Sequence, residues 1–344
     1  MKISLDRKII SYDSPVFIIA EAGVNHNGNL RTALKLIDAA VLAGVDAIKF
    51  QTFRAEDVVT RAGEMAEYQK KNIGRIESQL EMLKKLELPD DFYQPIIEHC
   101  RKKKIIFLSS PHGGFNSVDQ LVKLKLPAFK FGSGDLTNLP VLEYAAKFKK
   151  PMILSAGMAT LAEIQTAVKI IKRAGNDQII VLHCTTNYPC PFNEVNLRAM
   201  LTMKQKLPAL VGYSDHTPGI QTPIMAATLG ACLIEKHFTL DKNMPGPDHS
   251  SSLEPEELKT MVRMIREVPV ILGSEIKKPN PSERSMIKTV RKSIVAARNI
   301  KKGEIFSVRN LAIKRPGTGL NPNAWGRLLG KKAKKDFLTD ELLK

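Results

Sequence analysis

Polar side chains of catalytic type follow each of eight short apolar segments in this 344-residue chain. The segments are rich in β-branched residues and show no polar alternation, which is typical of parallel strands buried on both faces. Polar groups at all eight ends are hard to explain by packing and predict one shared site. The ends carry Glu21, Asn25 and His26; Lys49 and Gln51; Ser109 and Ser110; Lys130, Ser133 and Asp135; Ser155; His183, Thr185, Thr186 and Tyr188; Ser214, Asp215 and His216; Glu235 and His237.

Two of these ends carry a lysine, Lys49 and Lys130. A lysine buried without an anionic partner is costly. One interpretation is an ion pair with Glu21 or Asp135. The other is a site for a phosphate or carboxylate ligand, in which each ammonium acts as a point charge. Hydroxyl groups that would assist such a site belong to Ser133, Ser155 and Ser214.

Two histidines, His216 and His237, end the last two segments. Neighbouring strands lie ~4.8 Å apart, so imidazoles at the same height could share one divalent metal. Mixed nitrogen and oxygen ligands suit Mn, Fe, Co or Zn. Each histidine taken singly could instead be a hydrogen-bonded core residue. His26, His99 and His112 receive no role from this pattern.

Two carboxyl groups, Glu21 and Asp248, are candidates for proton transfer or for binding sugar hydroxyls. Asp248 lies in the sequence MPGPDHSSSLEP, where glycine and prolines shape a turn after the last segment. The alternative for Asp248 with residues 250–252 is capping of the final helix.

The elements that position these residues repeat as strand and helix. In one helix Thr160 and Glu163 fit a capping box, and in the last helix the apolar spacing ends at Gly273. Eight such units match a (β/α)8 barrel, with an open doubly wound sheet as the alternative. The expected strands are Val16–Ala20, Ala47–Phe50, Ile105–Leu108, Ala128–Phe131, Met152–Leu154, Ile179–Leu182, Leu210–Val211 with Tyr213, and Leu233–Ile234 with Phe238.

We predict three parts along the chain: a barrel over residues 1–276, a linker over 277–286 and a small unit over 287–344. The linker prediction rests on the sequence KKPNPSE, whose two prolines are typical of a connection. Within the barrel, the long charged interval 54–88 predicts an extended loop on the catalytic face, with helical character in ESQLEMLKKLEL. The small unit is expected to contain short strands at Ser293–Ala296 and Leu311–Lys314.

The composition is that of a globular protein, with 43% apolar and 25% charged residues. No apolar run approaches the ~18 residues of a membrane span, and the opening residues contain no apolar stretch of signal-peptide length. We therefore expect a cytoplasmic protein. The four cysteines, Cys100, Cys184, Cys190 and Cys232, are too scattered to predict a disulfide framework.

The net charge is +17, and residues 285–344 hold 15 Lys and Arg against 4 Asp and Glu. Such a basic unit could bind nucleic acid or a membrane surface. It could equally be a solvated face, or a lid over an anionic substrate. The charge alone leaves all three open.

The sequence resembles the sialic acid synthase family from about Val16 to Leu343. The resemblance is carried, in fixed order, by FIIAEAGVNHNGN, AIKFQTF, FKFGSGDLTNLP, MILSAGM, LHCTTNYPCP, VGYSDHTPGI, IEKHFTLDKNMPGPDHSSSLEP and KSIVAARNIKKGEIFSVRNLAIKRPGTG. Within the family, AEYQKKN, ESQLEMLKKLEL and PFNEVNLRAM look more like legionaminate synthases than N-acetylneuraminate synthases.

This resemblance implies a (β/α)8 TIM barrel followed by an antifreeze-like (SAF) domain. It also implies a domain-swapped homodimer, in which the small domain of one chain covers the partner's barrel. The implied reaction joins phosphoenolpyruvate to an N-acylated mannose-type sugar, either 2,4-diacetamido-2,4,6-trideoxymannose or N-acetylmannosamine. The product would be a nonulosonic acid, and the implied cofactor is Mn²⁺, with Co²⁺ or Mg²⁺ as alternatives.

The resemblance also assigns roles to single residues. Glu21, His216 and His237 would be catalytic, with both histidines holding the metal. Phosphoenolpyruvate would contact Lys49, Ser110, Lys130, Ser133, Ser155, Thr186 and Ser214. The sugar would contact Gln51, Asp135, Tyr188, Asp248 and Arg315, the last reaching across from the other subunit.

The chain departs from the family pattern in three places. Some members have Glu where Asp135 stands, which shortens this side chain. The family asparagine is displaced in CTTNYP, so Thr186 or Asn187 would make its contact. The stretch SSPHGG has His112 in place of the phenylalanine often found after STP. Two alternative functions remain at this stage: a synthase acting on a sugar phosphate, and a nucleic-acid-binding protein that uses the basic C-terminal unit.

Overall fold

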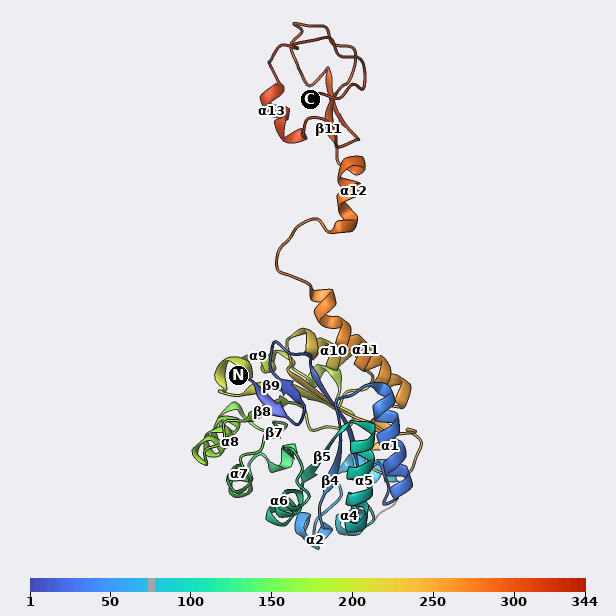
Figure 1. Ribbon diagram of the computed structural model, residues 1–344, viewed down its shortest axis with the longest axis vertical. Coiled ribbons are helices and arrows are strands. Elements are labelled where there is room, and N and C mark those ends of the chain that lie inside the picture. The colour runs from blue at the N-terminus through green and yellow to red at the C-terminus, as the bar shows by residue number, and fades with distance from the viewer. Residues whose placement is uncertain (74–77) are drawn as a thin grey trace. The chain divides into compact units, whose positions relative to one another are not determined.

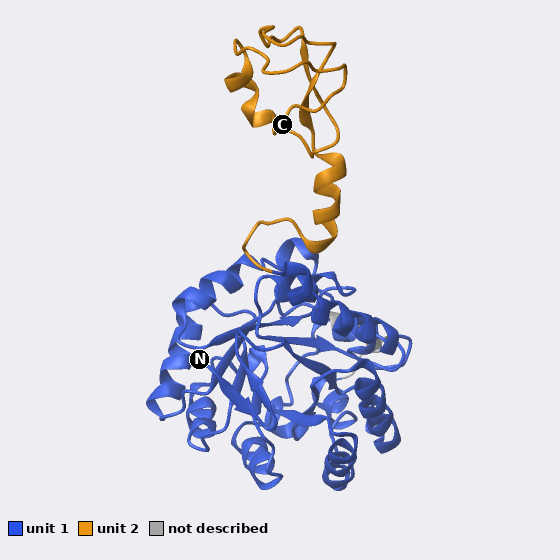
Figure 2. Ribbon diagram, turned by 45° about the horizontal axis from the view of Figure 1, so that its top comes forward, with its two compact units in different colours: residues 1–273 blue, residues 274–344 orange. Residues whose placement is uncertain are grey.

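The computed structural model describes residues 1–73 and 78–344. The chain divides into two compact units, Met1–Gly273 and Ser274–Lys344 (Figure 2). Residues 281–286, which the sequence places in a linker, begin helix α12 (Pro281–Val290). The helix starts there because Asn280 and Glu283 form a capping box and Pro281 occupies its first turn.

The first unit is built on eight parallel strands, and helices surround them (Figure 1). Their order is β5-β4-β3-β10-β9-β8-β7-β6, and β5 and β6 at the two ends of this order lie side by side. The predicted (β/α)8 barrel is therefore confirmed. The strands are β3 (Phe17–Gly23), β4 (Ala47–Thr52), β5 (Ile106–Pro111), β6 (Phe129–Phe131), β7 (Met152–Ser155), β8 (Ile179–His183), β9 (Leu210–Asp215) and β10 (Leu233–His237).

Eight helices follow these strands in turn. The capping box of Thr160 and Glu163 forms as predicted, and Gly273 ends the last helix with a φ of 60°. Glu254, not Asp248, caps that last helix, so the capping alternative for Asp248 is wrong. The helices are α1 (Leu30–Ala43), α5 (Asp90–Lys103), α6 (Gly114–Lys123), α7 (Leu139–Ala146), α8 (Leu161–Arg173), α9 (Arg198–Lys206), α10 (Gln221–Thr228) and α11 (Pro255–Leu272).

The barrel interior is apolar at one end only. A hairpin of β1 (Ile3–Leu5) and β2 (Lys8–Ile10), absent from the sequence predictions, packs its apolar residues with Phe17, Ile19 and Leu108. Side chains alternate along each strand, so the residues two and four positions after these apolar strand residues also face the interior. The hairpin thus closes the N-terminal end of the barrel and leaves the polar strand ends at the other.

The described part of the long segment between β4 and α5 contains three short helices: α2 (Ala55–Val58), α3 (Glu67–Ile73) and α4 (Gln79–Lys84). Glu77, the first residue of the predicted helical stretch, lies outside the described residues. Met65, Met82 and Leu86 from this segment pack on Val24 and Phe53. This small apolar cluster fixes the segment at the C-terminal end of the barrel.

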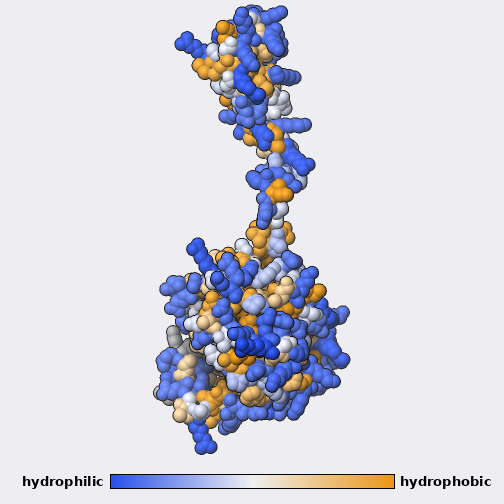
Figure 3. All heavy atoms as spheres, turned by 90° about the vertical axis from the view of Figure 1, so that its left-hand side faces the viewer, coloured by the Kyte–Doolittle hydropathy of each residue, from blue (hydrophilic) through white to orange (hydrophobic). Residues whose placement is uncertain are grey.

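The second unit has its own core around the antiparallel pair β11 (Ser293–Ala296) and β12 (Leu311–Lys314), and both strands occur where predicted. A short helix α13 (Trp325–Leu328) packs on this core. On the face seen in Figure 3 most side chains of this unit are hydrophilic. None of the described helices combines the length and hydropathy that a membrane span requires.

Candidate active site

The polar strand ends line one cavity of about 500 Å³ at the C-terminal end of the barrel. Strand alternation explains the set: in β3 and β4, Glu21 and Lys49 lie two residues after Ile19 and Ala47, which face the interior core. Predicted residues that line the cavity are Glu21, Lys49, Gln51, Ser110, Lys130, Ser133, Asp135, Ser155, Thr186, Tyr188, Ser214, His216, His237 and Asp248.

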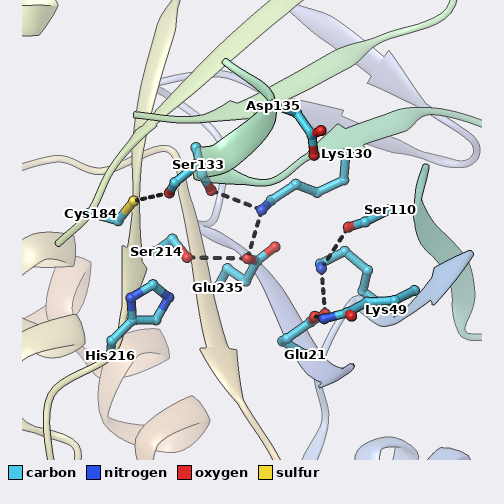
Figure 4. Close-up of polar contacts among 12 residues, drawn as sticks. Glu21, Lys49, Ser110, Lys130, Ser133, Asp135, Cys184, Ser214, His216 and Glu235 are labelled. Carbon is cyan, nitrogen blue, oxygen red and sulfur yellow. Dashed lines mark hydrogen bonds and ion pairs between the residues drawn. The ribbon is translucent and has the colours of Figure 1, made fainter. Parts of the chain in front are cut away.

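Lys49 is held by two neighbouring strands. Its Nζ lies 2.5 Å from the Glu21 carboxylate on β3 and donates to Ser110 Oγ at 2.9 Å on β5 (Figure 4). Gln51 donates to the same carboxylate at 3.4 Å. Both charged side chains of the ion pair are buried. The ion pair that the sequence offered as one interpretation of Lys49 is thus present.

Lys130 has a different partner from the one expected. Its Nζ lies 3.0 Å from Glu235 (Figure 4). The same Nζ donates to Ser155 Oγ at 2.8 Å. Ser214 donates to the same carboxylate oxygen of the pair, Glu235 Oε1, at 3.1 Å. The expected pairing with Asp135 is wrong, because β6 and β10 face each other across the barrel interior and Asp135 turns to His112 at 2.9 Å.

The two glutamates differ in their protonation equilibria. Burial pushes the pKa of Glu235 up, but the nearby Lys130 and Lys49 outweigh it and hold the pKa at about 2. Burial raises the pKa of Glu21 more than its contact with Lys49 lowers it, and the charge on Glu235 adds to the rise. The four groups thus form one coupled cluster, in which Glu21 takes up a proton more readily than Glu235.

His216 and His237 meet as predicted, with ring centroids 5.5 Å apart. His216 Nδ1 donates to the carbonyl of Thr185 at 2.6 Å, which leaves Nε2 as its acceptor. Burial lowers the pKa of His216 to about 4, and burial together with His216 lowers the pKa of His237. Both imidazoles are therefore neutral at neutral pH, the form that binds metals.

The donor set fits a metal only in part. His237 Nδ1 is buried and has no hydrogen-bond partner in the described part of the chain, as expected of a nitrogen reserved for a ligand. Within residues 1–73 and 78–344, no group of three or more His, Cys, Asp or Glu side chains forms a metal cluster. A metal here would have two imidazole ligands and complete its shell with water or substrate oxygens. Asp215, beside His216, pairs with Lys236 at 2.5 Å instead.

Ser133 and Thr186 come together beside Gly157. A Cβ at Gly157 would lie 2.2 Å from Thr186 Oγ1 and 2.7 Å from Ser133 Oγ, so only glycine allows this approach. Thr186 Oγ1 is buried and finds no hydrogen-bond partner among residues 1–73 and 78–344, and Thr186 lines the cavity. Asn187, in contrast, is exposed. Of the two candidates left open by the sequence, the cavity receives Thr186.

Tyr188 lies beside the histidine pair, and Asp248 lies near Glu21. The Tyr188 ring centroid is 4.1 Å from that of His216 and 5.5 Å from that of His237. Burial and the charge of Glu21 raise the pKa of Asp248 to about 7. Arg315 belongs to the second unit, where it is exposed after β12.

Two parts of the cavity were not assigned a role from the sequence. Glu235 and His112 line it beside the predicted residues. The signal for Glu235 was its place at a strand end, but only the closed barrel shows its partner. An apolar wall also borders the cavity, and no sequence pattern identified it: Val24, Val58, Met82, Leu83 and Leu86.

Comparisons with known proteins agree with this architecture. The model of the NeuB family matches residues 36–277, and that of the SAF domain matches residues 291–344. The chain is 50% identical to N,N'-diacetyllegionaminic acid synthase of Campylobacter jejuni, over 95% of this chain and 98% of the relative. It is 44% identical to the synthase of the same name from Legionella pneumophila, over 92% and 90%.

A solved structure gives the same picture. The N-acetylneuraminic acid synthetase of Leptospira borgpetersenii superposes with a TM-score of 0.74 at 36% identity, covering 83% of this chain and 95% of that one. The two legionaminic acid synthases thus share more identity with this chain than the neuraminic acid enzyme does. Sequence, fold and cavity lead to one conclusion: the chain belongs to the NeuB family of synthases and carries a C-terminal SAF domain.

Proposed function

We propose that the protein condenses phosphoenolpyruvate with an N-acylated mannose-type aldose and water to give a nonulosonic acid and phosphate. The observation that carries the proposal is the meeting of two buried lysines and two neutral imidazoles in one cavity. C3 of phosphoenolpyruvate bonds to the aldehyde carbon, water bonds to C2, and the bond from C2 to the phosphate oxygen breaks. One water proton ends on the new hydroxyl group and the other on phosphate.

Lys49 and Lys130 are the proposed anchors of phosphoenolpyruvate, with the hydroxyls of Ser110, Ser133 and Ser155 beside them. Fixed ammonium groups in a site with little water interact strongly with phosphate and carboxylate charge. Each lysine is already oriented by a serine hydroxyl at 2.9 or 2.8 Å. This arrangement supports a binding site that needs little rearrangement to receive the anion. Ser214 and Thr186 complete the proposed set.

His216 and His237 are the proposed ligands of a divalent ion, Mn²⁺ first, with Co²⁺ or Mg²⁺ as alternatives. The ion would supply Lewis-acid polarisation of the aldehyde carbonyl. The orphaned Nδ1 of His237 and the Nε2 of His216 left open by its bond to Thr185 support this assignment. Glu21 is proposed as a further catalytic group beside Lys49.

The sugar is proposed to lie against Gln51, Asp135, Tyr188 and Asp248, with 2,4-diacetamido-2,4,6-trideoxymannose preferred to N-acetylmannosamine. The apolar wall supports this preference. The first sugar has a C6 methyl group and a second acetyl methyl group where the other has hydroxyls. Burying a methyl group against apolar side chains makes the free energy of binding more favourable. The greater identity to two legionaminic acid synthases points the same way.

The second unit is proposed to act as a lid in a domain-swapped homodimer, with Arg315 contacting the sugar of the partner's site. Its 15 Lys and Arg against 4 Asp and Glu over residues 285–344 suit a cover for anionic substrate. Exclusion of water by such a cover would strengthen the electrostatic interactions below it.

The test is phosphate release from phosphoenolpyruvate with each aldose in turn, followed by mass spectrometry of the product. We expect a nine-carbon acid with both N-acylated sugars and faster turnover with the deoxy diacetamido sugar. Turnover only with a phosphorylated aldose would favour the sugar-phosphate alternative. A salt-sensitive gel shift with nucleic acid, without phosphate release, would favour the binding protein.

A further inference from the structure

The two departures from the family pattern at residues 112 and 135 meet in one contact. His112 Nδ1 and Asp135 Oδ2 are 2.9 Å apart, and both residues line the cavity. His112 follows β5 and Asp135 lies in a short turn after β6, so 23 positions separate them in the chain. The carboxyl side chain of Asp135, which is shorter than the Glu of some family members, is thus in contact with the imidazole of His112.

Two backbone hydrogen bonds fix the position of His112, and a glycine leaves room for its ring. The backbone NH of His112 donates to the carbonyls of Thr52 and Ser110 at 3.0 and 3.1 Å. A Cβ at Gly132 would lie 2.8 Å from His112 Cε1, so the ring occupies space that only glycine leaves. Gly132 directly precedes Ser133, one of the proposed phosphoenolpyruvate ligands. The edge of the ring that carries Cε1 therefore lies against Gly132, in the turn that leads to Ser133.

The contact with Asp135 determines what the imidazole can do. A carboxylate accepts a hydrogen bond, so Nδ1 of a neutral imidazole carries the proton and Nε2 keeps its lone pair. Among the described residues, Nε2 has no hydrogen-bond partner. Side-chain exposures of 27% for His112 and 18% for Asp135 leave the pair open to the cavity. This is the arrangement of a general base oriented by a second group.

The other candidate bases in the cavity are engaged or have another proposed role, which for Asp248 is contact with the sugar. Glu21 lies 2.5 Å from Lys49, and Glu235 lies 3.0 Å from Lys130. His216 and His237 face each other and are the proposed metal ligands. His112 is thus an imidazole of the cavity with a free acceptor and no other role.

We propose that His112 is the general base that activates the attacking water and that Asp135 is its positioning residue; this rests on the proposed function. The water O–H bond breaks as its oxygen bonds to C2, and His112 Nε2 takes the proton. That proton then passes to the bridging oxygen of phosphate as the bond from C2 to this oxygen breaks. The second water proton ends on the hydroxyl formed from the aldehyde.

Charged groups on several elements surround the imidazole. Asp135 faces it from the turn after β6, and Asp57 of α2 lies beside Gly113. Lys49 and Lys130 share the cavity, and Glu21 and Glu235 balance them. The charged groups nearest to His112 are thus carboxylates.

The test removes the imidazole of His112 by substitution and then supplies free imidazole in the assay buffer. We expect His112→Ala to lower kcat by about 100-fold or more, and added imidazole to restore part of it. Restoration should rise with pH, as the neutral form of the added imidazole accumulates. The matched control is His99→Gln on α5, because His99 and Asp38 form a pair of the same 2.9 Å length outside the cavity. This control should keep the wild-type kcat and stay insensitive to imidazole.

A second measurement does not depend on turnover. Nitrogen NMR of the ring of His112 should report a proton on Nδ1 and none on Nε2, and Asp135→Asn should weaken this preference. A proton on Nε2 of His112 in the wild-type protein would contradict the proposal that this residue is the general base. So would a folded His112→Ala variant that keeps its kcat, or that loses kcat without rescue by imidazole. Wild-type protein that releases no phosphate with either sugar overturns the proposed function itself.

Discussion

Replacing Lys130 by methionine separates the stability of the barrel from the chemistry proposed for it. The side chains of Lys130 and Glu235 are each 4% exposed and lie 3.0 Å apart. Lys130→Met keeps most of the length of the side chain but removes its charge. Glu235 then stays buried with Ser214 and the more distant ammonium of Lys49 as its remaining partners.

We expect this single change to lower the free energy of unfolding by about 3–5 kcal/mol, the usual cost of leaving one member of a buried ion pair unpaired. Such a loss is a large fraction of the ~5–15 kcal/mol that holds a domain together. Adding Glu235→Leu removes the orphaned carboxylate. The double variant should therefore regain most of the lost stability, since apolar replacement of both partners is often neutral.

Urea unfolding followed by circular dichroism measures the stability, and phosphate release measures the activity. The control is Arg263→Met on α11, which breaks an exposed pair with Glu267 of 2.9 Å. We expect it to cost less than about 1 kcal/mol. Both Lys130 variants should release phosphate at a rate near background, because the proposed phosphoenolpyruvate ligand is missing from each.

Two results would refute this reasoning. If the double variant is no more stable than Lys130→Met, the loss does not come from an unpaired Glu235. If the double variant regains activity together with stability, Lys130 supports the fold and does not bind the anion.

Three further predictions concern the same cavity. The pKa of Asp248 is raised to about 7 in the folded state, whereas the unfolded state loses this proton above pH ~4, so the free energy of unfolding falls as pH rises from about 4 to 7. Asp248→Asn removes this dependence. In urea unfolding, its stability relative to wild type should therefore be about 2–3 kcal/mol higher at pH 8 than at pH 5. Chelation with EDTA should abolish phosphate release and added Mn²⁺ or Co²⁺ should restore it, whereas indifference to EDTA would contradict the metal proposal. Truncation after Pro279 should leave a folded barrel with severely reduced turnover, and full activity would contradict the lid.

The barrel was predictable because its strands have a simple sequence pattern. Each strand is a short β-branched run, and all eight occur within a few residues of the predicted positions. Alternation along a strand then carries the interior face from apolar residues such as Ile19 to polar ones such as Glu21. Alternation can therefore predict in part which residue types reach the cavity, since strand-end residues such as Asn25 and Asp215 do not line it. Of the 15 residues to which the family resemblance assigned a role, 14 line the cavity, and Arg315 lies in the other unit.

What the sequence could not predict depends on closure of the barrel. Glu21 and Lys49 are register partners on adjacent strands, so their pair is close to local information. Lys130 and Glu235 come from β6 and β10, which are not neighbours in the sheet and meet only across the interior. His112 likewise meets Asp135 through two loops after different strands. Pairings of this kind depend on tertiary geometry, which residue spacing does not contain.

The charge pairs of the cavity also explain how one site can be stable when empty and still receive an anion. Two lysines and two glutamates balance each other, so the folded barrel does not bury excess charge. An incoming phosphate and carboxylate would compete with both glutamates for the same ammonium groups. Because the pKa of Glu21 is raised and that of Glu235 is held at about 2, Glu21 is the group that can neutralise itself. If the lysines bind the anion as proposed, protonation of Glu21 would free Lys49 for it while Glu235 keeps Lys130 oriented.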